Sequence, residues 1–293
     1  MAKAIFFDLD DTLVRTSDAD RVAYDAVKRR LERELGAAVD AEACVERYKR
    51  GVKKTPWDTQ TAEASEEGAE TSSECVDTDK MAAAKTPMHV WSWRRVLWER
   101  ALEESVSLGD EDARRKLDYC AYVANDTFRD VRLRELKIPR TVKDEIEALK
   151  CAGVIVGVIT NGDPVIQREK LAACGAYKVF PNELILVGGE EILAGREEKP
   201  GRGVFERALA LAGASADRAV FMGDNWNADI VGASAAGYAG AVWIKRDDEK
   251  DDERSVVDAW NGGKPLENFL FIRANSVVDA CRDAHLEEWV TDG

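Results

Sequence analysis

Two aspartates that could do chemistry, Asp8 and Asp10, follow directly after an apolar run at residues 4–7. Because successive side chains of a strand point to opposite faces, Asp8 and Asp10 are expected to share one side, with Asp11 on the other. Crowding carboxylates where water is scarce is costly unless a positive charge joins them. The pattern therefore indicates a site in which Asp8 and Asp10 act together, and it leaves Asp11 the role of shaping the turn.

Two further apolar runs, VIVGVI and VFMG, also end in polar residues. These residues are Thr160, Asn161 and Gly162 after the first run, and Asp224 and Asp229 after the second. In open parallel sheets, ligands bind beyond the carboxyl ends of the strands. The three runs are therefore expected to bring four carboxylates to one edge of a sheet.

Four carboxylates at one edge would repel one another unless a cation binds between them. Oxygen-only ligands favour a hard cation, and Mg²⁺ commonly pairs one or two carboxylates with a substrate phosphate. Lys199 could neutralise phosphate oxygens, while the Thr160 hydroxyl and the turn amides of 161–162 could hold others. Asp8 is placed to be a nucleophile and Asp10 to exchange protons as general acid and base. These parts predict phosphoryl transfer assisted by Mg²⁺.

The elements that must position these residues alternate between apolar strands and amphipathic helices. Strands are predicted in the runs 2–7, 153–163, 218–225 and 240–246, with a fifth strand or a hairpin at 177–180 and 183–189 and an edge strand at 268–272. Helices are predicted at 140–153, 164–176, 203–214 and 227–238. Such alternation indicates an α/β fold with a Rossmann-like parallel sheet, and nearly continuous apolar strands indicate helices on both of its faces.

The region between the first strand and the helix at 140 contains no comparable strand. Its helical patterns lie at residues 18–35, 40–54, 88–106 and 110–135. The predicted domains are an α/β core formed by residues 1–16 and 134–293 and an all-helical cap formed by residues 17–133. Within the cap, residues 58–87 are acidic and almost free of large apolar side chains, so this insert is expected to be disordered.

Taken together, the motifs resemble the haloacid dehalogenase superfamily, in its phosphatase branch with a helical cap after the first strand. The resemblance rests on the run Asp8-Leu9-Asp10-Asp11-Thr12, the strand ending in Thr160-Asn161-Gly162, the pair Lys199-Pro200, and Gly223-Asp224 followed by Asp229. Matching segments cover residues 1–16 and roughly 134–245, and the cap matches in position and character only. Trp226 departs from the family pattern, because small polar residues are common at its position.

The resemblance implies a role for each acid. Asp8 would form an aspartyl-phosphate, and Asp10 would protonate the leaving group and then activate water. Mg²⁺ would be held by the Asp8 carboxylate, the Asp10 main-chain carbonyl and Asp224, with Asp229 assisting through water.

The resemblance also implies phosphate contacts. Thr160 and Lys199 would hold the phosphoryl group, Thr12 would steady the turn after the nucleophile, and Asn161 would contact the phosphate or the substrate.

The predicted cap offers two cations, Arg94 and Arg95, in a helix rich in tryptophan. One interpretation is that this helix packs its aromatic side on the cap core. The alternative is that Arg94 or Arg95 meets an anionic substrate.

Composition limits the partners and the compartment. The formal net charge of −14 and the pI of about 4.8 argue against a nucleic-acid partner. No apolar run is long enough to span a bilayer, and the six cysteines include no C-x-x-C pair, so neither a zinc site nor a disulfide framework is expected. Cys151 and Cys174 are expected to be buried thiols. The predicted localisation is cytoplasmic.

These observations lead to the hypothesis of a Mg²⁺-dependent phosphomonoester hydrolase acting on a small phosphorylated metabolite. Sugar phosphates, nucleoside monophosphates, acylneuraminate-type phosphates and glycolytic phosphates all stay open, as does the oligomeric state. A phosphomutase would share the same core residues. A dehalogenase would also use Asp8, although that branch of the family does not keep the acid at position 10. A catalytically silent binding protein is the alternative outside enzymes.

Overall fold

The computed structural model describes residues 2–54, 89–107, 111–246 and 269–291. Contacts divide the chain into two compact units, residues 1–19 with 133–293 (unit 1) and residues 20–132 (unit 2). We propose that these units are the core and cap domains expected from the sequence. The acidic insert at 58–87 lies outside the described residues.

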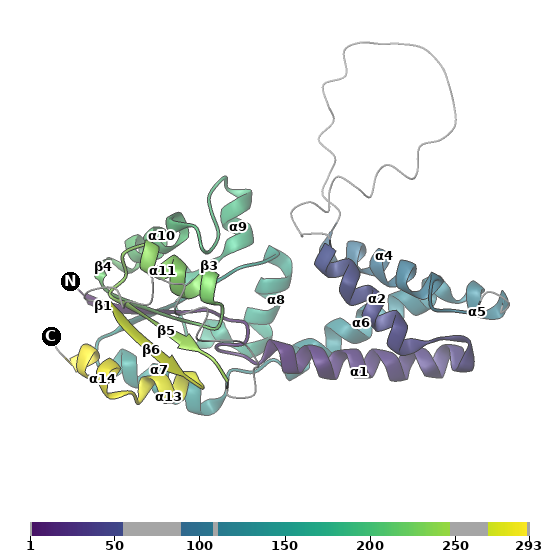
Figure 1. The fold of residues 1–293 in the computed structure, drawn as a ribbon, viewed down its shortest axis with the longest axis horizontal. Helices are drawn as coiled ribbons and strands as arrows, with labels where there is room; N and C mark the ends of the chain where they lie inside the picture. The colour runs from purple at the N-terminus through teal and green to yellow at the C-terminus, as the bar shows by residue number, and fades with distance from the viewer. Residues whose placement is uncertain (1, 55–88, 108–110, 247–268, 292–293) are drawn as a thin grey trace, which may run out of the picture. The chain divides into compact units, whose positions relative to one another are not determined.

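Unit 1 is built on a six-stranded sheet in which all neighbouring strands are parallel (Figure 1). In spatial order the strands are β3 (Ile185–Val187), β2 (Ile155–Thr160), β1 (Ala2–Phe7), β4 (Ala214–Gly223), β5 (Gly240–Ile244) and β6 (Leu270–Ala274). In β1, Ile5 and Phe7 pack into the apolar core on one face, and Ala4 and Phe6 pack into the core on the other. This alternation explains why the strands read as continuous apolar runs.

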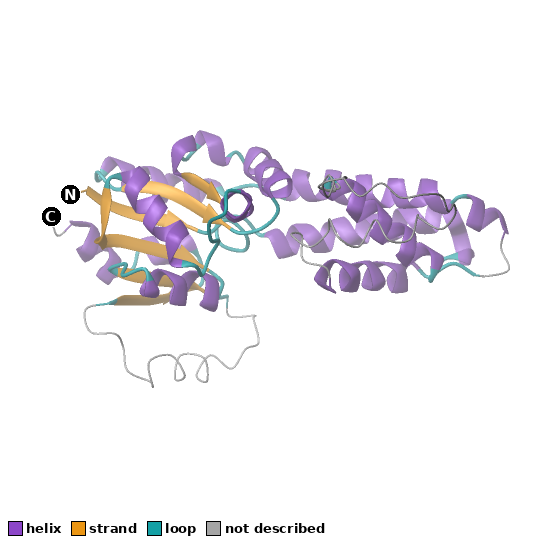
Figure 2. Cartoon of the chain, turned by 90° about the horizontal axis from the view of Figure 1, so that it is seen from above, coloured by secondary structure: helices purple, strands orange, loops and turns teal. Residues whose placement is uncertain are grey.

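Helices cover both faces of this sheet, as Figure 2 shows. On the face of Phe7 lie α7 (Arg140–Cys151), α8 (Pro164–Cys174), α13 (Val277–Cys281) and α14 (Ala284–Thr291). On the face of Phe6 lie α10 (Arg202–Ala212), a π-helical turn (Trp226–Val231) and α11 (Gly232–Ala235). The short helix α9 (Gly188–Leu193) follows β3. The predicted α/β fold with a Rossmann-like core is confirmed.

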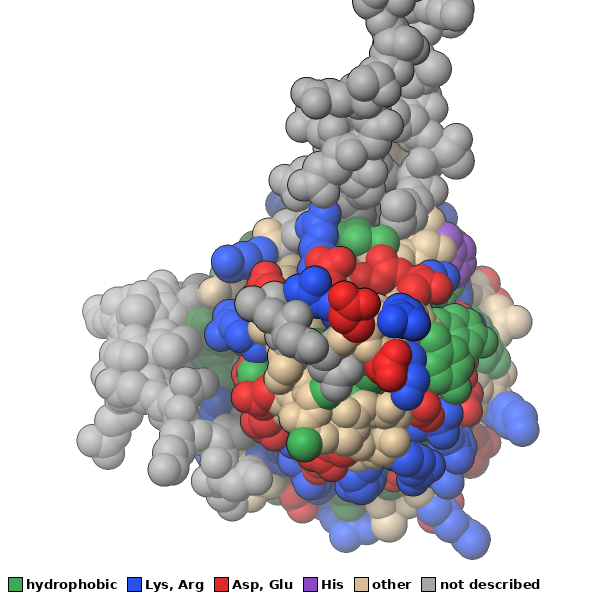
Figure 3. Space-filling model, turned by 90° about the vertical axis from the view of Figure 1, so that its right-hand side faces the viewer, with side chains coloured by type: hydrophobic (Ala, Val, Ile, Leu, Met, Phe, Trp, Pro, Cys, Tyr) green, Lys and Arg blue, Asp and Glu red, His purple; other side chains and the backbone are tan. Residues whose placement is uncertain are grey.

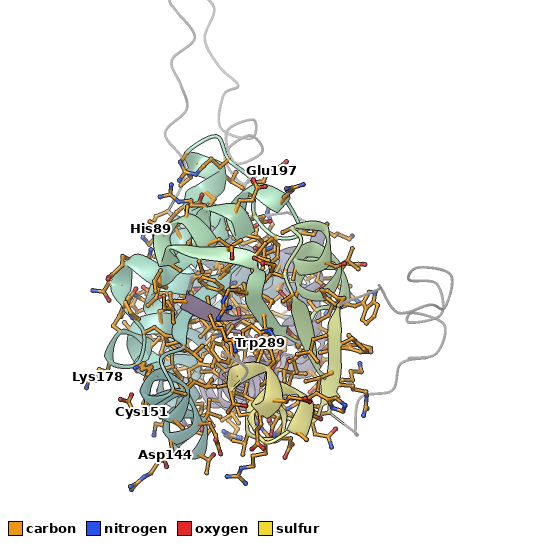
Figure 4. The ribbon with its side chains drawn as sticks, turned by 90° about the vertical axis from the view of Figure 1, so that its left-hand side faces the viewer. His89, Asp144, Cys151, Lys178, Glu197 and Trp289 are labelled. Atoms are coloured by element: carbon orange, nitrogen blue, oxygen red, sulfur yellow. The ribbon has the colours of Figure 1, made fainter. Side chains whose placement is uncertain are left out.

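The predicted fifth strand is confirmed in the run 183–189: it is β3, which pairs in parallel with β2, so the hairpin alternative is not formed. The run 177–180 forms no strand, because Gly175 takes a left-handed conformation and residues Ala176–Lys178 form a single 3-10 turn after it. One other local prediction in unit 1 is wrong. Cys151 was expected to be buried, but it ends α7 on the exposed side and points outward in Figure 4, whereas Cys174 is buried.

Unit 2 is helical throughout the part that the structure describes, apart from one isolated bridge between Val39 and Val106. Its helices are α1 (Thr16–Leu35), a 3-10 turn (Gly36–Ala38), α2 (Ala41–Lys54), α4 (Val90–Glu103), α5 (Glu111–Arg115) and α6 (Leu117–Glu135). Helices α1 and α6 continue into unit 1. Tyr48 of α2 and Trp98 of α4 stack in the core with ring centroids 3.8 Å apart. The predicted helical cap is confirmed as a fold.

The surface carries both signs of charge. On the face in Figure 3, acidic and basic side chains are interspersed, as expected from the ion pairs three or four residues apart along the helices. Among the described helices, none combines the length and the apolar character needed to cross a bilayer.

Candidate active site

A buried lysine joins two carboxylates at the carboxyl edge of the sheet. The Nζ atom of Lys199 lies 2.6 Å from Asp8 Oδ1 and 2.7 Å from Asp229 Oδ1. The exposed fractions are 3% for Lys199, 6% for Asp8 and 1% for Asp229. Burial acts to lower the pKa of Lys199, but the charges of Asp229 and Asp8 outweigh it and raise the pKa above its ordinary value. The lysine is therefore a fixed cation.

Strand register places Asp8 at this edge. Phe7 pairs with Val158 of β2 and Met222 of β4, and the Asp8 amide continues the pairing by donating to the Met222 carbonyl at 2.8 Å. Asp8 is thus the first residue of β1 beyond the sheet, between the ends of two neighbouring strands. Its position follows from main-chain hydrogen bonds, which makes its carboxylate well placed for chemistry that depends on orientation.

The turn after β4 holds Asp229 against the end of the sheet. The Asn225 amide donates to Asp229 Oδ2 at 2.9 Å, and the Asp229 amide donates to the Asn225 carbonyl at 2.8 Å. A Cβ atom at Gly223 would overlap the Asp229 carboxylate, so only glycine fits there. Trp243 of β5 donates its indole N–H to the Asp224 carbonyl at 2.8 Å.

Trp226, the departure from the family pattern, packs beside this loop. Its ring lies 4.9 Å from the Trp243 ring and 5.8 Å from the Phe271 ring, centroid to centroid. The bulky side chain is therefore accommodated by aromatic packing, next to the indole that holds the Asp224 carbonyl.

Three carboxylates converge here and could hold a metal ion. One oxygen from each of Asp8, Asp224 and Asp229 lies within 4.8 Å of the others. Burial raises the pKa of Asp8 well above its ordinary value despite the opposing charge of Lys199. Burial, followed by repulsion from Asp229, raises the pKa of Asp224 to about 7. One lysine offsets only one of the three negative charges, so the donor set fits a hard divalent cation such as Mg²⁺.

The Thr160 hydroxyl could also bind a ligand at this edge of the sheet. Thr160 ends β2, is fully buried, and its Oγ1 atom has no hydrogen-bond partner among the described residues. The Oγ1 atom of Thr12 is likewise buried and without a partner there. An unsatisfied buried hydroxyl costs about 1–3 kcal/mol. Thr160 is the last residue of β2 and Thr12 follows the neighbouring strand β1, so both hydroxyls lie toward the carboxyl edge of the sheet.

Asn161 and Gly162 help to fix the shape of the site. The Asn161 side chain donates to the Lys199 carbonyl at 2.6 Å and accepts from the Lys199 amide at 3.1 Å. Both ends of this amide are therefore engaged with the lysine main chain, so Asn161 positions Lys199. A contact of Asn161 with the phosphate or the substrate stays a prediction. Gly162 adopts φ +115°, a conformation that favours glycine.

The fourth predicted carboxylate, Asp10, is not in the three-carboxylate cluster. Lys170 Nζ lies 2.8 Å from each Asp10 oxygen, Gln167 Nε2 donates to Oδ2 at 2.9 Å, and the Thr16 hydroxyl donates to Oδ1. The alternation used to group Asp10 with Asp8 no longer applies, because β1 ends at Phe7.

Asp11 has the turn-shaping role expected from the sequence. It has φ +53°, and its carboxylate accepts hydrogen bonds from the Ser17 amide, at 2.9 Å, and from the Ser17 hydroxyl. The left-handed residue turns the chain, and the carboxylate fixes the turn to the first residues of α1.

Gln167 and Lys170 were missed from the sequence. They lie three residues apart on α8, so they share one face of that helix. The sequence signal was available in QREK, a polar pair at i and i+3 in a helix that begins just after Thr-Asn-Gly. It was overlooked because a buried lysine with a carboxylate partner looks like any surface lysine in a single sequence.

The two cap arginines make their described contacts within unit 2. Arg95 pairs with Glu99 at 3.1 Å and with Asp118. The Arg94 guanidinium carbon lies 5.3 Å from the Trp91 ring centroid and 5.9 Å from that of Phe128. The structure therefore supports the packing interpretation for this helix, and a substrate contact by either arginine stays a prediction.

The sheet carries a lysine, three carboxylates and an unsatisfied hydroxyl at its carboxyl edge, where ligands bind in open parallel α/β sheets. The family model of the haloacid dehalogenase-like hydrolases matches residues 2–237, and the chain belongs to that family.

Relatives of known name agree with this family. N-acylneuraminate-9-phosphatase of Rattus norvegicus is 29% identical over 244 residues, 83% of each chain. Ribulose-1,5-bisphosphate 5-phosphatase of Halopiger xanaduensis is 29% identical over 259 residues, 87% of this chain and 90% of its own. A crystal structure of 2-haloacid dehalogenase from Pseudomonas syringae superposes with a TM-score of 0.56 at 23% identity, covering 99% of this chain and 98% of that one, which shows a shared fold. The predictions of the phosphatase branch and of a hydrolase acting on phosphoric monoesters are confirmed.

Proposed function

We propose that this chain is a Mg²⁺-dependent phosphatase that hydrolyses a small phosphorylated metabolite through an aspartyl-phosphate on Asp8. The observation that carries the proposal is the buried contact of Lys199 with Asp8 and Asp229, beside Asp224 and the unsatisfied hydroxyl of Thr160. This set combines a nucleophile with groups that neutralise phosphate oxygens. No other cluster of carboxylates in the described part of the chain has metal-binding geometry.

The first half of the reaction uses Asp8 and Asp10. A carboxylate oxygen of Asp8 attacks phosphorus, the bond from phosphorus to the leaving oxygen breaks, and protonated Asp10 gives its proton to that oxygen. In the second half, water attacks the phosphorus of the aspartyl-phosphate and gives a proton to the Asp10 carboxylate. Phosphate leaves, and Asp8 and Asp10 return to their starting states.

The other groups stabilise charge. Lys199 and the Thr160 hydroxyl would bind phosphoryl oxygens, Asn161 would hold Lys199 in place, and the amide of Gly162 would donate to a further oxygen. The oxygens of Asp8 and Asp224, with the Asp10 main-chain carbonyl, would hold Mg²⁺, and Asp229 would assist. When bound, this ion would supply the positive charge that allows two anions, the carboxylate and the phosphate, to meet.

The relatives support the proposed substrate class. N-acylneuraminate-9-phosphatase and ribulose-1,5-bisphosphate 5-phosphatase are named for small phosphorylated metabolites, which supports the same class here. We propose that unit 2, including Arg94 or Arg95, selects the leaving group. A cytoplasmic location, where such metabolites occur, is part of the proposal.

The competing functions make different products. A phosphomutase would keep the phosphate on the product, and a dehalogenase would release halide from a halogenated acid. The dehalogenase likeness concerns the fold alone, and the acid Asp10 favours phosphatase chemistry. A silent binding protein would turn over none of these compounds.

A panel of metabolite phosphates, assayed for released inorganic phosphate, tests the proposal. The panel should contain sugar phosphates, nucleoside monophosphates, acylneuraminate phosphates and glycolytic phosphates, each with Mg²⁺ and with EDTA. We expect release from at least one of them, reduced about 10²-fold or more by EDTA because the carboxylate cluster then lacks its cation. Transfer without release would show a mutase, and halide release from 2-chloropropionate without phosphatase activity would show a dehalogenase.

A further inference from the structure

The Asp10 carboxylate is held by three side chains from two segments of unit 1. Thr16 comes from the start of α1, and Gln167 and Lys170 come from the first turns of α8. Gln167 and Lys170 are each 4% exposed, although both are polar. Burying an ammonium group is costly unless it is paired and hydrogen-bonded, so Lys170 and Asp10 fix each other in this arrangement.

The local sequence explains why α8 delivers these two residues to the site. Asp163 caps the helix by accepting from the Ile166 amide at 3.0 Å, and Pro164 occupies the first turn. The helix therefore begins directly after the carboxyl end of β2, close to the sheet edge. Gln167 and Lys170 lie on one face within its first two turns, so both reach Asp10.

Gln167 also links the acid to the lysine side of the site. Its Nε2 atom donates to Asp10 Oδ2 and to the Asn161 carbonyl, and the Asn161 side chain binds the main chain of Lys199. A Cβ atom at Gly162 would lie 3.1 Å from the same Nε2 atom, so the glycine allows the turn to pass close to Gln167. Contacts thus run continuously from Asp10 to Lys199.

We infer that Lys170 and Gln167 are positioning residues for Asp10, the acid and base of the proposed reaction, whose carboxylate they hold in one orientation at the carboxyl edge of the sheet. This inference rests on the proposed function, since it concerns how Asp10 acts in that reaction. Both oxygens of Asp10 bond to Lys170, so the carboxylate plane is fixed as well as its position. A fixed donor is needed because proton transfer requires a distance and direction that a freely rotating carboxyl group meets only part of the time.

The dependence of the rate on the leaving group distinguishes positioning of the acid from a purely structural role. A poor leaving group such as phenol needs a proton as the bond breaks, whereas 2,4-dinitrophenol leaves well without one. For each of these substrates, kcat/KM reports the steps up to cleavage of the bond between phosphorus and the leaving oxygen. Loss of a correctly placed acid therefore lowers kcat/KM for phenyl phosphate far more than for 2,4-dinitrophenyl phosphate.

We expect Lys170→Met to lower kcat/KM about 10- to 100-fold on phenyl phosphate and no more than about threefold on 2,4-dinitrophenyl phosphate. Asp10→Asn should show the same pattern, and Lys170→Arg should recover most of the activity because it keeps the cation. Lys178→Met is the matched control, since Lys178 is exposed and points away from unit 1 in Figure 4. It should leave both rates unchanged.

Gln167→Met tests the same arrangement and keeps the pair of Lys170 with Asp10, so it leaves no charge without its partner. It replaces Lys170→Met as the test if that variant does not fold. It should show the same dependence on the leaving group. Equal losses on both substrates, or no loss in folded variants, would overturn the inference while the proposed function stands. A wild-type enzyme that releases phosphate from neither aryl phosphate and from no compound of the metabolite panel would overturn the proposed function, and the inference that rests on it.

Discussion

Asp8→Asn is expected to lower kcat on the best phosphate of the panel by about 10⁴-fold or more, because the amide cannot serve as the nucleophile. The change is nearly isosteric, and it removes one of three clustered negative charges. The variant should therefore fold, and without metal it should be no less stable than the wild type. Steady-state kinetics, with thermal unfolding in EDTA, would measure both effects.

Asp11→Asn provides the matched control three residues away. Asp11 has φ +53° and its carboxylate binds Ser17, outside the cluster of Asp8, Asp224 and Asp229. Asparagine tolerates the left-handed region, so this variant should keep kcat within several-fold of the wild type. An Asp8→Asn enzyme with wild-type activity, or an Asp11→Asn enzyme equally inactive, would contradict the assigned roles.

Lys199→Met should have the largest effect on stability. It leaves Asp8 and Asp229 buried without the ammonium group that now lies 2.6 and 2.7 Å from them. Removing one partner of a buried ion pair typically costs about 3–5 kcal/mol of unfolding free energy, and we expect that loss in EDTA at pH 8. Activity should also fall, because the phosphoryl oxygens lose a fixed cation.

The pH dependence of this loss follows from the direction of the Asp8 shift. Burial already raises the pKa of Asp8, and removing Lys199 removes the charge that opposes the rise. An aspartate with a raised folded-state pKa takes up a proton as the pH falls, which relieves the burial of its charge. The difference between variant and wild type should therefore be smaller at pH 5 than at pH 8.

Chemical denaturation at the two pH values would measure this difference. Lys150→Met is the control, because its pair with Glu147, at 3.2 Å, lies on the surface, where ion pairs contribute little. A Lys199→Met protein as stable as Lys150→Met at pH 8 would contradict the buried contact.

The strands that carry the site could be predicted, with the polar residues at their ends, because β1, β2 and β4 are buried on both faces toward their carboxyl ends. Residues such as Ala4–Phe7 must all be apolar in that setting, and the first polar residue then marks the edge of the sheet. Asp8, Thr160 and Asp224 were located in this way. No strand forms at 177–180, because a short apolar run predicts burial more securely than it predicts a strand.

The arrangement around Asp10 was beyond sequence reasoning. Strand alternation gives side-chain direction only while the strand lasts, and β1 ends before Asp8. Lys170 is 160 positions away from Asp10, so their pairing depends on how α8 packs on the face of the sheet that carries Phe7. Periodicity identified the helix but could not show which polar residues it turns toward the site.

Trapping the covalent intermediate tests the central claim most directly. The wild-type enzyme would be mixed with Mg²⁺ and the best phosphate, quenched in acid within its first turnovers and reduced with borohydride, which converts an aspartyl-phosphate to homoserine. Peptide mass spectrometry would then locate the modified residue. We predict homoserine at position 8 alone, and none in enzyme quenched without substrate. Homoserine at position 10, at position 224 or at any other position, with position 8 unmodified while phosphate is being released, would contradict Asp8 as the nucleophile.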